Sequence, residues 1–140
     1  MLDHDTSALE NTTRKLYKAF EKHLTWKWDD RFDTVLAEFD AKNQDMVINI
    51  IQGHMGDIWD AGNFQKAPEV IKIVIRFFGG LHPGQELFTT HTDKDDLLLC
   101  AWWPWSNGKK ISIRLGVFAQ SLSDEDNKEL SQLFKGWFGL

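Results

Sequence analysis

Several features that would assign a protein to a class are missing from this chain of 140 residues. It has one cysteine, Cys100, which excludes an internal disulfide framework and any zinc site built from several cysteines. No apolar run approaches the roughly 18 residues that a membrane span requires. The first residues also lack the pattern of a secretory signal peptide. We therefore expect a cytoplasmic protein that does not bind membranes.

Motifs that support catalysis or bind cofactors are missing as well. The sequence has no phosphate-binding loop, no dinucleotide fingerprint, no nucleophile elbow and no His-Glu-x-x-His motif. The formal net charge is −5, whereas general nucleic-acid binders are basic. We therefore expect no cofactor and no nucleic-acid partner, and we favour a non-enzymatic protein over an enzyme.

Tryptophan and phenylalanine are abundant, with seven and ten residues respectively, whereas there is one tyrosine. A single domain of this length buries roughly two-thirds of the surface of its unfolded chain, so the core needs no disulfide or metal. The chain contains no repeat, no low-complexity segment and no linker. We therefore predict one domain over residues 1–140.

The N-terminal half has the apolar spacing of helices, with apolar residues at intervals of three and four. This spacing predicts four helices, which begin near Ser7, Asp29, Asn43 or Asp45, and Pro68. Their apolar stripes are Leu9, Leu16, Phe20 and Leu24; Phe32, Val35, Leu36 and Phe39; Val47, Ile48, Ile51, Met55, Ile58 and Trp59; and the run from Val70 to Phe78. Because the fourth helix is apolar nearly all round, we expect it to be buried centrally.

The C-terminal half has the period of strands. Residues 86–92, 97–105 and 109–119 predict a three-stranded antiparallel meander, with a four-residue loop that places Thr92 opposite Leu97. Ser123 and Asp126 have the spacing that caps a final helix. We therefore predict an α+β domain of two layers, with a helical N-terminal half, this meander, and a C-terminal helix packed on the sheet.

The hairpin turn determines which side chains share a face of the sheet. A two-residue type I′ turn at Asn107-Gly108 places Trp102 opposite Ile113 on the core face. Trp103, Trp105 and Arg114 then lie on the other face, where the middle strand is also apolar. Either helices cover this second face, or it is an exposed platform of the kind that marks a binding site or an oligomer interface.

The acidic excess is confined to one stretch. Residues 29–60 contain two basic and eight acidic residues, a net charge of −6, whereas the rest of the chain is nearly neutral. A solvated pair of helices explains this pattern, and so does a surface that attracts a basic partner. The residues that we expect to bind a partner are Trp103, Trp105, Arg114, Asp29, Asp30 and Asp33.

Two functions remain compatible with these features. The first is a non-enzymatic protein-interaction module, of the inhibitor, immunity, chaperone or adaptor type, which binds a basic protein or a second copy of itself. It would use the acidic helical surface, the tryptophan-bearing sheet face, or both. The alternative is a small-ligand-binding or enzyme domain with a pocket between the fourth helix and the sheet. The side chains that would line this pocket are His82, His91, Trp59 and Trp102.

Histidine and carboxylate residues recur in the predicted third helix, where His54, Asp57 and Asp60 lie three residues apart. This spacing would suit a divalent metal ion, but it is also common on the solvated surface of a helix. Cys100 and His91 would lie on adjacent strands, without a third group to orient the imidazole. We therefore predict neither a metal site nor a catalytic residue.

Overall fold

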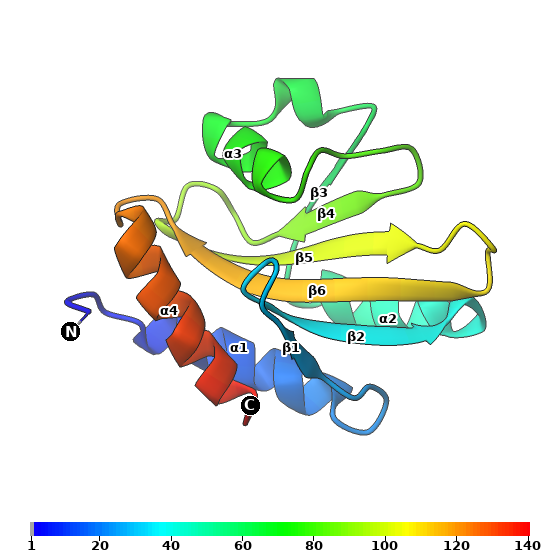
Figure 1. Cartoon of the computed structure of the whole chain (residues 1–140), viewed down its shortest axis with the longest axis horizontal. Coiled ribbons are helices and arrows are strands. Elements are labelled where there is room, and N and C mark those ends of the chain that lie inside the picture. The colour runs from blue at the N-terminus through cyan, green and yellow to red at the C-terminus, as the bar shows by residue number, and fades with distance from the viewer. Residues whose placement is uncertain (1) are drawn as a thin grey trace.

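A six-stranded antiparallel sheet runs through the protein, with its strands in the order β1-β2-β6-β5-β4-β3 (Figure 1). The computed structural model describes residues 2–140. The strands are β1 (Lys27–Asp29), β2 (Thr34–Asp40), β3 (Asp57–Asp60), β4 (Glu86–Thr89), β5 (Asp96–Pro104) and β6 (Lys110–Ala119). The helices are α1 (Ser7–Phe20), α2 (Gln44–Gln52), α3 (Glu69–Phe77) and α4 (Asp124–Trp137), with short 3-10 turns at Ala41–Asn43 and Phe64–Lys66.

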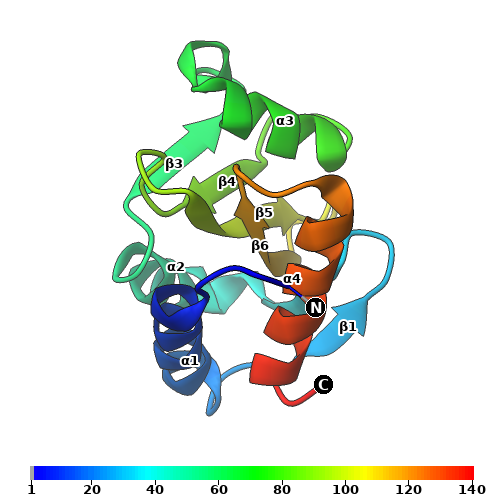
Figure 2. The same cartoon turned by 90° about the vertical axis from the view of Figure 1, so that its left-hand side faces the viewer.

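Helices cover both faces of the sheet (Figure 2). Helices α1, α2 and α4 pack on one face, where Leu16, Ile51 and Phe134 are completely buried. Helix α3 packs on the other face, where it buries Ile71 and Val74. The α+β prediction is therefore confirmed, but the expected two layers are wrong, and the three strands predicted as a meander form only part of a six-stranded sheet. The sheet has three further strands, β1, β2 and β3, which come from the half of the chain predicted to be helical.

The register of the β5–β6 hairpin agrees with the sequence analysis. Trp102 pairs with Ile113, and Trp103 pairs with Ser112. The turn itself is different, because Trp105 and Lys110 form the last hydrogen-bonded pair and residues 106–109 make a four-residue loop. Gly108 has φ +71°, but Asn107 does not have the positive φ that a type I′ turn requires at both central residues. The predicted two-residue turn and the observed four-residue loop both place Trp105 opposite Lys110, so the register is the predicted one.

The helix predicted from Asp29 is wrong, because residues 27–40 form the β1–β2 hairpin. Strand β2 lies between β1 and β6, and residues 34–37 are all buried. A strand that is covered on both faces loses the alternation of apolar and polar residues, so its sequence resembles a short helix. The acidic surface predicted for residues 29–60 is therefore not formed by a pair of helices, because its first part is a β-hairpin.

The third predicted helix is too long. Helix α2 ends at Gln52, and Ile58 and Trp59 lie on the edge strand β3, which pairs with β4. Gly53 follows the last residue of the helix with φ −68° and ψ −15°.

The fourth predicted helix forms as α3, but it is not central. It covers one face of the sheet, so one side of the helix remains in solvent. Ile73 is 42% exposed and Phe77 is 55% exposed. Of the two alternatives for the second sheet face, cover by a helix is therefore the one observed, and the covering helix leaves part of its own apolar surface in solvent.

Strand β4 is shifted by one residue from the predicted register, since Thr89 pairs with Leu99. The shift places Phe88 opposite Cys100 in the core. His91 lies beyond the end of β4 and is exposed. None of the helices in residues 2–140 combines the length and the apolar character needed to cross a bilayer.

Candidate functional site

An apolar groove of about 320 Å³ opens between α3, the β1–β2 loop, β6 and the first half of α4. Its walls come from five stretches of the chain, in the β1–β2 hairpin, α3, β5, β6 and α4. The lining residues are Phe32, Asp33 and Thr34; Ile73, Val74, Phe77 and Phe78; Leu99, Gly116, Val117 and Phe118; and Asp124, Asn127, Lys128 and Ser131. This volume lies at the lower end of the range typical of ligand sites.

Gly116 allows the β1–β2 hairpin to approach the sheet closely at the groove. A Cβ atom on Gly116 would lie 3.0 Å from Cγ2 of Thr34 and 3.4 Å from Cδ1 of Leu99. The next residue along the wall, Asp33, has φ 51°, a left-handed conformation that aspartate tolerates better than most residues. The shape of the groove therefore depends on backbone geometry at Gly116 and Asp33.

The rim of the groove on α3 is apolar and accessible to solvent. Ile73 and Phe77 both line the groove and are both exposed, by 42% and 55%. The ring of Phe77 packs edge-on against Phe32, with 6.1 Å between the ring centroids. The apolar surface thus continues from the groove onto the outer side of the helix.

The rim on the opposite side carries charge. Asp33 and Asp124 line the groove together with one base, Lys128. The apolar groove therefore has a rim on which acidic residues outnumber basic ones.

Three of the predicted binding residues form one cluster, but they support the fold rather than offering a free surface. The Nε atom of Arg114 donates to Oδ2 of Asp29 at 2.8 Å, and both side chains are at most 16% exposed. The guanidinium group lies 4.4 Å from the ring centroid of Trp103. Trp103 in turn packs edge-on against Phe32 and Phe78, beneath α3 and the β1–β2 loop. The expected exposed platform is therefore largely covered.

The other predicted binding residues lie apart. Trp105 is 39% exposed and donates from Nε1 to Oγ of Ser112 at 2.8 Å. Asp30 is exposed in the β1–β2 loop, and Asp33 lines the groove. The acidic stretch 29–60 does not form one surface, because it runs from β1 at one edge of the sheet to β3 at the opposite edge. Several of its carboxylates face bases: Glu38 faces Lys27 at 3.8 Å, and Asp40 faces Lys110 at 3.7 Å.

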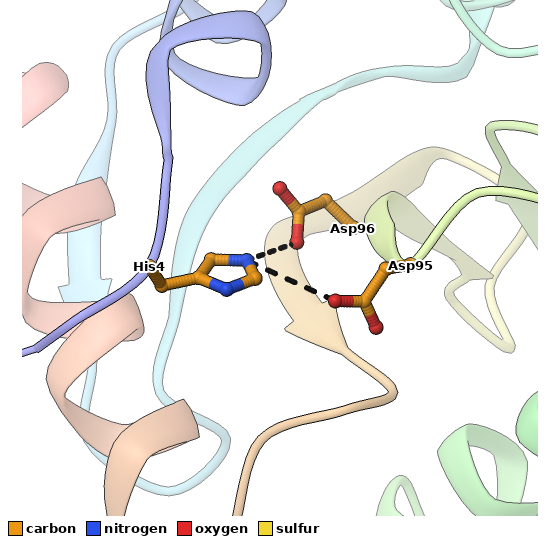
Figure 3. A group of neighbouring side chains, drawn as sticks. All are labelled: His4, Asp95 and Asp96. Carbon is orange, nitrogen blue, oxygen red and sulfur yellow. Dashed lines mark hydrogen bonds and ion pairs between the residues drawn. The ribbon is translucent and has the colours of Figure 1, made fainter.

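A second group of polar side chains lies outside the groove, where the N-terminal segment meets the start of β5. His4, Asp95 and Asp96 converge where the N-terminal segment passes the β4–β5 loop (Figure 3). Hydrogen bonding from the imidazole to Asp96, together with the nearby carboxylates, raises the pKa of His4 above 6.5 despite partial burial. The pKa of Asp95 is lowered, chiefly because its carboxylate accepts a hydrogen bond from the hydroxyl of Ser121.

The remaining candidates from the sequence do not form a site. Burial raises the pKa of the Cys100 thiol far above its usual range, so the thiolate is not accessible. His54 bonds to the carbonyl of Ile50, Asp57 faces His91, and Asp60 accepts from the backbone of Gly62 and Asn63. The residues expected to line a pocket, which are His82, His91, Trp59 and Trp102, do not line this groove.

The groove does lie between α3, which is the fourth predicted helix, and the sheet, where a pocket was predicted from the sequence. Its actual lining was missed because it depends on the β1–β2 hairpin, which was predicted to be a helix. One signal was available, since a glycine inside a strand such as Gly116 often marks a close approach of another segment. The His4 cluster had no signal, because 91 residues separate His4 from Asp95.

Comparisons with known proteins give no relative for this chain. No protein-family model matches the sequence. No curated protein is significantly similar to it, and no solved structure is significantly similar to its fold. A functional assignment therefore depends on the geometry of the groove.

Proposed function

We propose that the protein is a non-enzymatic protein-interaction module that binds an apolar anchor residue of a partner protein in the groove beside α3. The observation that supports this most strongly is the continuity between the groove and the exposed side chains of Ile73 and Phe77. Exposed aromatic and aliphatic residues beside a pocket are typical of protein interfaces, where a few buried anchors provide most of the binding energy.

The extent of the apolar surface favours a protein partner over a metabolite. Small-molecule sites bury most of their ligand within the cavity. Here the apolar surface extends beyond the cavity onto a helix face, which a small ligand would leave uncovered. A partner chain that inserts one side chain into the groove would also cover Ile73 and Phe77.

The charge at the rim indicates the chemistry of the partner. Asp33 and Asp124 contribute two negative charges to the lining of the groove, against which Lys128 contributes one positive charge. Complementary charge increases the association rate and discriminates against acidic partners. We therefore expect an apolar anchor flanked by lysine or arginine.

A selection from a library of short random peptides displayed on phage tests this proposal. The selected peptides should share a bulky apolar residue with a basic residue nearby, and their affinity should fall as salt increases. Phe77→Ser should weaken binding of a selected peptide about tenfold or more, because it removes an aromatic residue from the rim. Since Phe77 is 55% exposed, this variant is expected to fold.

Leu133→Ser provides the matched control, because Leu133 is 43% exposed on α4 and does not line the groove. This variant should bind the selected peptides with the affinity of the wild type. Equal binding by Phe77→Ser, or selected peptides without an apolar residue in common, would contradict the proposal. If the wild type is a dimer and Phe77→Ser is a monomer, the partner that covers the groove is a second copy of the chain and not a basic protein.

The volume and position of the groove favour a small-ligand-binding domain as the second candidate. A ligand of this type would contact Val74, Leu99 and Val117 within the cavity and would need no basic group. Tryptophan fluorescence of the protein in a panel of apolar metabolites distinguishes the two functions. Saturable binding of a metabolite by both the wild type and Phe77→Ser would favour this second candidate.

A further inference from the structure

Three side chains that commonly bind metal ions meet at the end of the sheet where β5 begins (Figure 3). Nε2 of His4 lies 2.6 Å from Oδ1 of Asp96 and 4.0 Å from Oδ2 of Asp95. One ligating atom of each residue lies within 4.8 Å of the other two. The side chains of His4 and Asp96 are 15% and 22% exposed, whereas that of Asp95 is 39% exposed, so the cluster lies at the surface with two members partly shielded.

The carboxylate of Asp95 is held in place before any ligand binds. Its Oδ1 accepts from the backbone nitrogen of Ser121 at 2.7 Å, and its Oδ2 accepts from the hydroxyl of the same residue. The side chain of Gln120 also donates to the carbonyl oxygens of Thr92 and Lys94. The β4–β5 loop is thus fastened to the connection between β6 and α4.

The cluster carries a net negative charge without a cation. Asp95 and Asp96 are adjacent carboxylates, and the single Nε2–H of His4 donates to one of them. With a neutral imidazole the three side chains carry two negative charges, and with a protonated imidazole they carry one. A divalent cation bound by the neutral imidazole and both carboxylates would reduce the net charge to zero.

We propose that His4, Asp95 and Asp96 bind one divalent transition-metal ion, and that Zn²⁺ fits this donor set best. An imidazole nitrogen with two carboxylate oxygens suits Zn²⁺, whereas Ca²⁺ and Mg²⁺ prefer oxygen ligands alone. Ligands about 2.1 Å from a tetrahedral Zn²⁺ lie about 3.4 Å apart. The present separations of 2.6 and 4.0 Å between Nε2 of His4 and the two carboxylates lie on either side of that value.

A metal ion at this position would fasten the N-terminal segment to the body of the domain. His4 is the residue of this segment that reaches the β4–β5 loop, and Leu2 packs against the core nearby. Because the folded protein brings together ligands that are 91 residues apart, Zn²⁺ should bind the native state in preference to the unfolded chain and stabilise it.

The experiment uses the full chain, freed of metal by a chelator and titrated with Zn²⁺ in a calorimeter. The wild type should bind one ion per chain, and its melting temperature should rise with the Zn²⁺ concentration. His4→Ala and Asp96→Asn should each weaken binding about tenfold or more, as loss of a ligand does. His91→Ala is the matched control and should bind as the wild type does, since exposed His91 faces Asp57 instead.

Titration of the wild type with Co²⁺ supplies an independent measurement. Absorption bands of tetrahedral Co²⁺ should appear in the visible range and should be lost in His4→Ala. The proposal is overturned if the wild type binds no Zn²⁺, or if His4→Ala binds it as tightly as the wild type. A loss of stability in His4→Ala without any metal binding by the wild type would identify a simple ion pair with Asp96, and would overturn it too.

Discussion

The ion pair between Asp29 and Arg114 is expected to stabilise the fold, although the sequence analysis assigned both residues to a binding surface. Oδ2 of Asp29 accepts from Nε of Arg114 at 2.8 Å, and Oδ1 accepts from the backbone nitrogen of Arg31 at 3.0 Å. The pair joins the β1–β2 hairpin to β6 beneath Trp103. Asp29→Ala removes both hydrogen bonds and leaves the guanidinium group of Arg114 partly buried without its partner.

The size of the effect follows from these two contacts. A hydrogen bond between charged groups contributes about 1.5–3 kcal/mol, and one to a backbone N–H about 1 kcal/mol. The side chains of Asp29 and Arg114 are 14% and 16% exposed, so water only partly restores the lost interactions. We therefore expect Asp29→Ala to lower the free energy of unfolding by about 3 kcal/mol. For a chain of this length, that corresponds to a fall of about 10 °C in melting temperature.

Urea unfolding followed by circular dichroism measures this change without depending on the fluorescence of Trp103. Asp30→Ala is the control, because Asp30 is an exposed neighbour, and its effect should stay within about 0.5 kcal/mol. A double-mutant cycle with Arg114→Met should give a coupling energy of about 1.5–3 kcal/mol. A loss below about 0.5 kcal/mol in Asp29→Ala would show that the pair behaves as a surface ion pair and would refute this reasoning.

Three further predictions concern the groove and the edge of the sheet. Gly116→Ala should lower the free energy of unfolding in urea by about 1–3 kcal/mol, because the added Cβ would lie 3.0 Å from Cγ2 of Thr34. Unchanged stability would show that the β1–β2 hairpin moves freely. Thr34→Val should leave the melting temperature unchanged or raise it, because Oγ1 of Thr34 is buried and has no hydrogen-bond partner among residues 2–140. A clear fall in melting temperature would show that the hydroxyl of Thr34 does form a hydrogen bond. Burial and the charge of the paired residue Asp60 raise the pKa of Glu86 above 4.5. The stabilisation from the protonated form of Glu86 is therefore complete below that value and is lost as the pH rises through the folded-state pKa. Glu86→Gln should thus be more stable than the wild type at about pH 7 and equally stable at about pH 3.5; equal stability at both would contradict the shift.

The sequence predicted the elements whose signals are local. The capping pair Ser123 and Asp126 correctly marked the start of α4, where Oγ of Ser123 accepts from the backbone nitrogen of Asp126 at 3.1 Å. The register of β5 and β6 was predicted because the turn between them is short, so the pairing depends on residues close in sequence. Short loops limit the choice of register to very few alternatives.

The elements that depend on distant partners were not predicted. Strand β2 pairs with β6, about 80 residues further along the chain, and burial on both faces removes its periodic signal. The register of β4 was wrong by one residue because its pairing with β5 closes at Thr90 and Leu98, which exchange hydrogen bonds, and not at Thr92 and Leu97. The groove and the His4 cluster both arise from such distant contacts, so neither could be assembled from the sequence.

The most direct test of the proposed function is a map of amide chemical-shift changes when a peptide selected from the library is added to the labelled protein. The proposal predicts that the largest changes fall at Ile73, Phe77 and Gly116, with smaller changes near Asp33 and Lys128. Residues at the far edge of the sheet, such as Trp59, should be unaffected. Changes centred on Trp105 or on β3, with none at α3, would contradict the assignment of the groove as the binding surface.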